Sequence, residues 1–157
     1  MTDFGLSTFS DQETKSICGT MEYIAPEVFK GSYGHQVDYW ALGVLIFEMI
    51  FSIPPFRSNK IEYLPKMIID GRIRFPTTPQ ITAECKDIIL RLLKKKEERL
   101  GGKNIQEIFD HPWFNDIDFE KLYNKEYSSI INIRKLSFGN EGIQVNVSED
   151  KRVGYDV

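Results

Sequence analysis

The sequence is poor in cysteine and histidine, with two of each among 157 residues. The two cysteines, Cys18 and Cys85, make no disulfide framework and suit a reducing compartment. No set of metal ligands accompanies His35 or His111, so we interpret both as structural residues of a loop and a helix end. The sequence also has no amino-terminal charged stretch followed by an apolar one, so nothing in it indicates secretion. We expect a cytoplasmic or nuclear location.

An excess of positive charge is also absent, because 20 Lys and Arg against 23 Asp and Glu leave a net charge of -3. This argues against a nucleic acid or an anionic membrane surface as the main partner. Residues 37–56 have the length of a membrane span, but they include Asp38 and Glu48 and are stopped by Pro54-Pro55. An acidic group near the bilayer midplane costs about 2.5 to 3.5 kcal/mol. We therefore expect no membrane span and interpret this stretch as the buried central helix of a domain.

What the sequence does contain, 41% hydrophobic residues with helical spacing, predicts one mainly helical core. One amphipathic helix is expected after Thr82, which can cap it. Its apolar face has the spacing i, i+3, i+4, i+7 and i+8: Cys85, Ile88, Ile89, Leu92 and Leu93. A second helix is expected after Asn104, with Glu107 at its third position as in a capping box. Between residues 58 and 70, Pro65 predicts a kink or a short helix that begins at Pro65.

Two motifs lie close together at the start of the chain, separated by a polar loop: Asp3-Phe4-Gly5 and Cys18-Gly19-Thr20-Met21-Glu22-Tyr23-Ile24-Ala25-Pro26-Glu27. Five shorter motifs follow: Asp38-Tyr39-Trp40-Ala41-Leu42-Gly43-Val44, Pro54-Pro55-Phe56, Arg74-Phe75-Pro76, Arg99-Leu100-Gly101 and His111-Pro112-Trp113-Phe114. In this order and spacing they resemble the second half of a protein kinase, from the activation segment to the last helix of the C-lobe. Within that family the chain resembles the AGC group of Ser/Thr kinases, nearest to the ribosomal-S6-kinase type.

The resemblance implies a mainly α fold, namely the C-lobe of the protein-kinase-like fold. That fold is incomplete here, since the N-lobe and the catalytic loop come before Asp3 in the family and are absent from this sequence. We expect residues 1–123 to form the C-lobe fragment. Residues 124–157 would form an AGC-like C-terminal tail, which its Ser, Gly, Asn and charged residues predict to be mobile.

For the reaction, the resemblance implies that ATP and Mg²⁺ are the cofactors of the complete enzyme. Asp3 would hold the magnesium ion against the nucleotide phosphates, while Phe4 sets the direction of Asp3 and Gly5 permits the turn. One carboxylate cannot hold Mg²⁺ without the nucleotide and the catalytic-loop Asn, so we expect the isolated chain to bind neither. The general base belongs to the His-Arg-Asp motif, which this sequence lacks.

Regulation is expected in the polar loop between the first two motifs. Ser16 matches the position at which an upstream activating kinase phosphorylates AGC kinases, and Thr14 is the alternative acceptor. A phosphate there adds about -1.5 to -2 charges and orders a loop by recruiting arginine.

Substrate recognition is implied for five residues. Thr20 would support Ser/Thr acceptors, and Ile17, Met21 and Ile24 would line a pocket for an apolar substrate residue after the acceptor. Glu48 matches an acidic position that binds substrate arginine upstream of the acceptor, as a carboxylate does well. The alternative for Glu48 is a carboxylate satisfied locally inside the domain.

Three further residues are expected to act structurally. Glu27 and Arg99 match a buried ion pair of the family that ties the activation segment to later helices. Asp38 matches a residue that accepts hydrogen bonds from the catalytic-loop backbone.

Two functions remain open from the sequence. The first is a fragment of a Ser/Thr protein kinase that transfers the ATP γ-phosphoryl to Ser/Thr hydroxyls of proteins with arginine upstream, the chain alone being inactive. The second is a stand-alone half-kinase that acts as a non-catalytic binding or decoy module. An in-frame His-Arg-Asp motif upstream of Met1 would favour the first, and a stop codon would favour the second.

Overall fold

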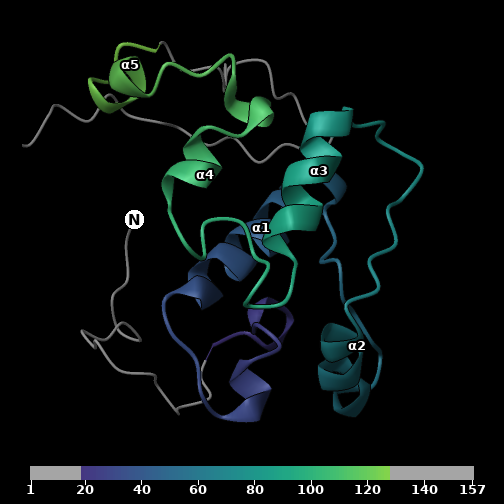
Figure 1. Cartoon of the computed structure of the whole chain (residues 1–157). Helices are drawn as coiled ribbons and strands as arrows, with labels where there is room; N and C mark the ends of the chain where they lie inside the picture. Colours follow the sequence, from purple (N-terminus) through teal and green to yellow (C-terminus); the bar gives the residue numbers. More distant parts are fainter. Residues whose placement is uncertain (1–18, 128–157) are drawn as a thin grey trace, which may run out of the picture. The chain divides into compact units, whose positions relative to one another are not determined.

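The computed structural model describes residues 19–127. The secondary-structure elements in this range are α-helices and short 3-10 helices, labelled η (Figure 1), which confirms the predicted mainly α fold. The chain divides into two compact units, residues 1–117 and 118–157. In chain order the elements are η1 (Met21–Tyr23), η2 (Val28–Lys30), α1 (Gln36–Phe51), η3 (Ile61–Tyr63), α2 (Leu64–Asp70), α3 (Ala83–Leu92), α4 (Gln106–Phe109), η4 (Pro112–Phe114) and α5 (Phe119–Tyr123).

The α1 helix is the centre of the first unit. Its buried side chains lie on one side of the helix, whereas Leu45 and Met49 on the opposite side are exposed. The buried side chains include Trp40, Val44, Ile46 and Phe47. The helix ends at Phe51, earlier than the apolar stretch, because Ser52 adopts a left-handed conformation with φ 57° and its amide donates to the Glu48 carbonyl at 2.7 Å. Among residues 19–127, no helix has the length and apolar character needed to cross a membrane.

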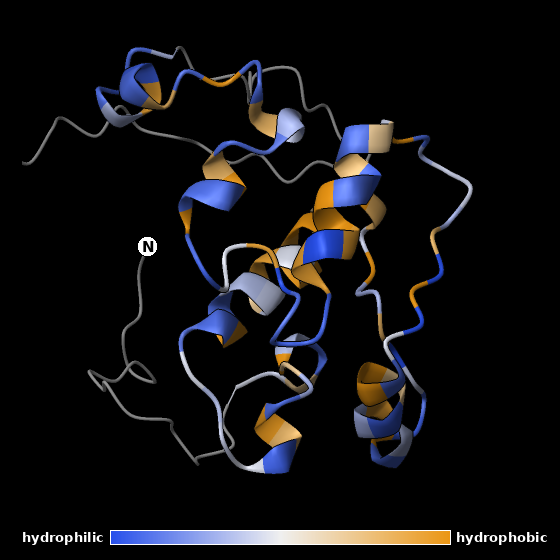
Figure 2. Ribbon diagram, viewed as in Figure 1, coloured by the Kyte–Doolittle hydropathy of each residue, from blue (hydrophilic) through white to orange (hydrophobic). Residues whose placement is uncertain are grey.

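The α3 helix packs across α1 and supplies the other half of the core (Figure 1). Thr82 caps it as predicted, since its Oγ1 accepts a hydrogen bond from the Cys85 amide at 3.2 Å. All five residues of the predicted apolar face are buried. Figure 2 shows hydrophobic residues concentrated where the two helices meet. Gly43 permits this close approach, because a Cβ there would lie 2.9 Å from the Cβ of Leu92.

Pro65 lies in the first turn of α2, where its missing amide hydrogen leaves no helical bond unmade. The short helix therefore begins at Leu64, one residue before the predicted start, and follows directly from η3. Leu64 and Ile68 are buried, and the helix ends at Gly71, which has φ 64°. The expectation of a short helix at Pro65 is thus confirmed.

The α4 helix has only part of the predicted capping box. Asn104 Oδ1 accepts a hydrogen bond from the Gln106 amide at 3.0 Å, as expected for a cap. Glu107 was predicted at the third helical position, and this is wrong, because α4 begins at Gln106 and Glu107 is its second residue. The Glu107 Oε2 accepts from the Gly101 amide at 3.1 Å, so it fastens the preceding loop to the helix.

The described part of the second unit is short. Asp118 caps α5 by accepting hydrogen bonds from the Glu120 and Lys121 amides, each 3.1 Å long. These bonds hold the pKa of Asp118 below its usual value, and the bond from the Lys121 amide has the largest effect. The Asp118 amide donates to the Tyr127 hydroxyl at 2.8 Å, which closes this segment on itself.

Candidate functional site

The segment that contains Thr20, Met21 and Ile24 lies against α1. Its short helix η1 packs on that helix, and Ile24 is buried while Met21 is partly buried against the core. Thr20 is exposed and extended, and its side chain makes no cap for η1. The structure therefore brings the predicted substrate residues Met21 and Ile24 to the same helix that carries Glu48.

Glu48 is held by a tyrosine that the sequence analysis did not single out. The Tyr23 hydroxyl donates to Glu48 Oε2 at 2.5 Å, and the two residues are 25 positions apart. This hydrogen bond is the main reason that the pKa of Tyr23 rises to about 12, with burial and the nearby negative charge adding to it. The hydrogen bond orients the carboxylate, and Oε1 accepts no hydrogen bond from any residue that the structure describes. One oxygen of Glu48 thus remains for a cationic ligand.

The sequence alone held only a weak signal for this pair. Tyr23 stands directly before Ile24-Ala25-Pro26-Glu27 in the long motif, and a tyrosine with a partly buried ring usually has a hydrogen-bond partner for its hydroxyl. Nothing in the sequence says that the partner is Glu48, since only the packing of η1 on α1 brings the two together.

Arg99 and Glu27 form a buried, two-pronged ion pair. The guanidinium donates to Glu27 Oε1 at 2.5 Å and to Oε2 at 2.8 Å, and the residues are only 3% and 7% exposed. Arg99 also donates to the carbonyls of Gln36 at 2.7 Å and Lys94 at 3.1 Å, and its guanidinium lies 5.3 Å from the centre of the Trp40 ring. One side chain therefore connects the Ala25-Pro26-Glu27 segment, the start of α1 and the loop after α3.

Asp38 lies exposed in the first turn of α1, and no residue of the described range donates a hydrogen bond to its carboxylate. A carboxylate there suits the positive end of the helix macrodipole. Leu45 and Met49 lie on the same face of α1, since 7 and 11 positions from Asp38 are about two and three helical turns. They are 42% and 66% exposed. This face has no cover from the described residues.

Both histidines contact other side chains of residues 19–127. His111 Nε2 lies 3.1 Å from Asp87 Oδ2, and its Nδ1 accepts from the Trp113 amide at 3.2 Å. The hydrogen bond with His111 is the largest cause of the lowered pKa of Asp87. His35 meets the Tyr39 ring edge-on at 5.9 Å between centroids.

Six of the predicted site residues lie outside the described residues: Asp3, Phe4, Gly5, Thr14, Ser16 and Ile17. Within residues 19–127 no three His, Cys, Asp or Glu side chains come close enough to hold a metal ion. The described residues therefore do not by themselves provide a site for Mg²⁺ and a nucleotide. The predicted magnesium site depends on Asp3, which lies outside the described residues.

This arrangement is that of a protein kinase C-lobe, and residues 1–114 match the protein kinase domain family. The chain belongs to the protein kinase family.

Within the family the chain is similar to Ser/Thr kinases of the AGC type. It is 42% identical over 130 residues to "Protein kinase 2" of Dictyostelium discoideum, covering 80% of this chain and 27% of that protein. It is also 42% identical over 129 residues to "Serine/threonine-protein kinase gad8" of Schizosaccharomyces pombe, covering 79% of this chain and 22% of that protein. Identity to "Serine/threonine-protein kinase sgk-1" of Caenorhabditis elegans is 40% over 132 residues, or 80% of this chain and 28% of that protein. The chain thus spans between 22 and 28% of the length of these three relatives.

Proposed function

We propose that this chain is the part of a Ser/Thr protein kinase that positions protein substrates, and that Glu48 binds an arginine upstream of the acceptor hydroxyl. The observation that carries the proposal is the Tyr23–Glu48 pair, which fixes a carboxylate beside Met21 and Ile24 and leaves Oε1 without a partner among the described residues. A guanidinium that approaches Oε1 gains a charge-assisted hydrogen bond of about 1.5 to 3 kcal/mol. Such a bond selects basic substrates.

The other substrate residues are assigned from the resemblance to the family. Met21 and Ile24, together with Ile17, would receive an apolar residue after the acceptor. Thr20 would donate its hydroxyl to the catalytic aspartate and so favour Ser/Thr over Tyr acceptors. Residues 1–123 would constitute the C-lobe part and residues 124–157 the tail.

ATP and Mg²⁺ are the usual cofactors of the family, and together they supply the γ-phosphoryl group and neutralise the phosphate charge. In this chain we assign only Asp3 to the metal. Because these 157 residues contain no His-Arg-Asp motif, we propose that the chain alone does not phosphorylate a basic Ser/Thr peptide. Turnover by the purified chain that is abolished by Asp3→Ala would disprove this.

The proposed role of Glu48 can be tested in a chimera in which this chain replaces the corresponding part of the Caenorhabditis elegans kinase sgk-1, called the sgk-1 chimera below. We expect Glu48→Gln to lower kcat/KM about 10- to 100-fold for a peptide with arginine upstream of the acceptor. The same variant should have little effect on a peptide with alanine in place of that arginine. Glu97→Gln, an exposed carboxylate outside the site, is the matched control. An equal loss on both peptides would mean that Glu48 is only structural.

A further inference from the structure

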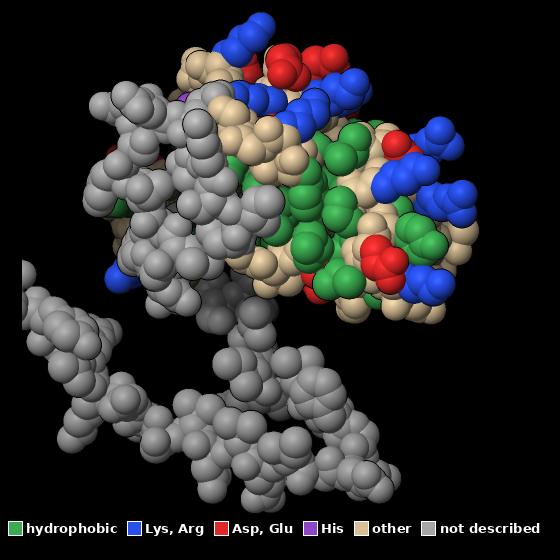
Figure 3. Space-filling model, turned by 90° about the horizontal axis from the view of Figure 1, so that it is seen from below, with side chains coloured by type: hydrophobic (Ala, Val, Ile, Leu, Met, Phe, Trp, Pro, Cys, Tyr) green, Lys and Arg blue, Asp and Glu red, His purple; other side chains and the backbone are tan. Residues whose placement is uncertain are grey.

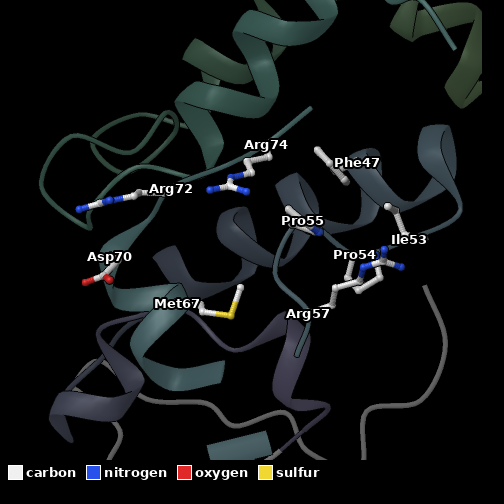
Figure 4. A pocket seen from close by; sticks show the side chains of 9 residues that line it. All are labelled: Phe47, Ile53, Pro54, Pro55, Arg57, Met67, Asp70, Arg72 and Arg74. Carbon is white, nitrogen blue, oxygen red and sulfur yellow. The ribbon is translucent and has the colours of Figure 1, made fainter. Parts of the chain in front are cut away.

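A cavity of about 560 Å³ lies between the end of α1, the loop that follows it, α2 and the segment after α2 (Figure 4). Its size is within the range of about 300 to 1,000 Å³ that is usual for ligand sites. Three arginines line it: Arg57, Arg72 and Arg74. One aspartate, Asp70, and an apolar floor that includes Pro55 and Met67 complete what we call the arginine cavity.

The charge of this cavity is opposite to that of the whole chain. Three guanidinium groups against one carboxylate leave about +2 in the lining, whereas the chain has a net charge of -3. Arg57, Arg72 and Arg74 are all exposed, and none pairs with a carboxylate of residues 19–127. Unpaired guanidinium groups around a concave surface attract carboxylates or phosphates, because they present a fixed fork of donors.

The arginines are spread along the cavity, which favours an extended ligand over a single small anion. Figure 4 shows Arg72 and Asp70 at one end of the cavity and Arg57 at the opposite end, with Met67 and Pro55 between them. An extended ligand with negative charge at both ends and an apolar group in the middle matches this order.

Apolar side chains are also exposed on α2, which lines the cavity, and on η3, which directly precedes α2. Ile61 and Tyr63 of η3 and Ile69 of α2 are exposed, as is Met67. Figure 3 shows one face of the molecule on which hydrophobic side chains lie beside several Lys and Arg side chains. Exposed apolar surface with a charged rim is typical of protein interaction sites.

We propose that the arginine cavity binds an acidic peptide segment of a partner protein, with an apolar side chain over Met67 and Pro55 and carboxylates at Arg57 and at Arg72 and Arg74. A peptide fits better than a nucleic acid, because the floor offers an apolar seat and Asp70 would repel a continuous row of phosphates. The site is distinct from Glu48, whose carboxylate favours basic peptides, and the proposal does not depend on kinase activity.

The test uses the full 157-residue chain, labelled at its amino terminus and kept at low concentration to limit association. The peptide Glu-Asp-Leu-Glu-Asp is titrated in by microscale thermophoresis. We expect the neutral peptide Gln-Asn-Leu-Gln-Asn and the peptide Glu-Asp-Gly-Glu-Asp each to bind about tenfold more weakly or worse, since one lacks the charge and the other the apolar anchor. A single-stranded oligouridylate that binds as tightly as the acidic peptide would overturn the proposal.

Two charge-matched variants locate the site. Arg72→Glu with Arg74→Glu, and Lys95→Glu with Lys103→Glu, each change two +1 groups to -1, so both take the net charge from -3 to about -7. We expect the first pair to weaken binding about tenfold or more and the second, exposed and outside the cavity, about threefold or less. Equal losses would mean long-range attraction without a site, and would disprove the proposal.

A measurement on the unsubstituted chain keeps the test decisive if a variant fails to fold. The acidic peptide with photo-leucine in place of leucine is irradiated with the chain, and the attachment points are mapped by mass spectrometry. Attachment within residues 53–74 is expected, since these contain the loop after α1, α2 and the segment that follows. Attachment only elsewhere would overturn the proposal. So would attachment within residues 53–74 that an excess of unlabelled acidic peptide reduces no more than an excess of neutral peptide does.

Discussion

Arg99 donates two hydrogen bonds, 2.5 and 2.8 Å long, to the carboxylate of Glu27, which lies 72 positions earlier in the chain. Both residues are buried, and the same guanidinium also binds the Gln36 carbonyl and lies over the Trp40 ring. The pair therefore joins the end of the second motif to the start of the central helix. Burying a charge is costly unless it is paired and hydrogen-bonded, so the two residues depend on each other.

Replacing Arg99 by methionine should destabilise the sgk-1 chimera by about 3 to 5 kcal/mol, because it leaves the Glu27 carboxylate buried without a partner. Unfolding by urea measures the change. Arg91→Met, which removes an exposed pair with Asp87, is the control and should cost about 1 kcal/mol or less. A double variant, Glu27→Leu with Arg99→Met, should recover part of the loss. Equal costs for Arg99→Met and Arg91→Met would contradict a structural role for the buried pair.

The raised pKa of Tyr23 predicts a loss of stability at high pH. The hydroxyl titrates at about 12 in the folded chain against 10.0 for an ordinary tyrosine, so folding favours its protonated form. That stabilisation is complete below pH 10 and is lost as the pH rises from about 10 toward 12. We expect the free energy of unfolding of the sgk-1 chimera to fall more steeply in this range than that of its Tyr23→Phe variant. Tyr123→Phe, at an exposed position, should behave like the unsubstituted protein; parallel curves for all three would refute the assignment.

Gly43→Ala should destabilise the packing of α1 on α3. The added Cβ would lie 2.9 Å from Leu92 Cβ and 3.0 Å from Leu93 Cδ2. Alanine gains about 1 kcal/mol over glycine within a helix, whereas overpacking a core costs about 1 to 3 kcal/mol. A net loss of up to about 2 kcal/mol is expected from thermal or urea unfolding. Gly34→Ala is the control, because its Cβ meets only the end of the flexible Gln36 side chain; a larger loss there than at Gly43 would show that close helix packing is not the cause.

The isolated chain should be marginally folded, bind a hydrophobic dye and aggregate. The side of α1 that carries Leu45 and Met49 is exposed, and leaving a large apolar side chain in water forfeits about 1.5 to 3 kcal/mol. Coexpression with the first half of a related kinase should reduce dye binding and aggregation. Leu45→Ser with Met49→Ser should also lower dye fluorescence, while Ile105→Ser, exposed elsewhere, should leave it nearly unchanged. A sharp cooperative melt of a monomer without dye binding would refute the prediction and favour a stand-alone binding module.

Phosphorylation of Ser16 should activate the sgk-1 chimera. An upstream kinase that activates AGC kinases should modify this residue, and a phosphate would add about -1.5 to -2 charges that arginine can bind. Ser16→Ala should then lower the activity by a large factor, and Thr14→Ala is the matched control in the same loop. Mass spectrometry identifies the modified residue. Modification at Thr14 alone would eliminate Ser16 as the regulatory site.

Local signals in the sequence were sufficient for several elements of the fold. Thr82 with its following apolar face predicted α3, and Pro65 predicted the start of α2 to within one residue. Such signals depend on neighbours within one or two turns, so they can be recognised without the fold. Glu107 shows where local signals fail. Its carboxylate accepts a hydrogen bond from the Gly101 amide in the preceding loop, which the capping pattern around Asn104 did not predict.

The candidate site was only partly accessible in the same way. The motif order identified the family, and through it Glu48, whose role as a substrate residue stays a prediction. Tyr23 and the arginine cavity were not foreseen. The cavity combines residues from three segments, and no spacing between Arg57, Arg72 and Arg74 indicates that they line the same cavity.

By itself the sequence determined the family, the helical class and the helix signals at Thr82 and Pro65, since each depends on residue order or on close neighbours. Only the tertiary structure decided that Tyr23 orients Glu48 and that the Arg99 guanidinium contacts Glu27, Gln36 and Trp40. It also decided that three arginines line one cavity together with apolar side chains. The physical reason is that these contacts join residues far apart in sequence. Their free energy exists only once the packing of η1, α3 and α2 around α1 has brought the groups together.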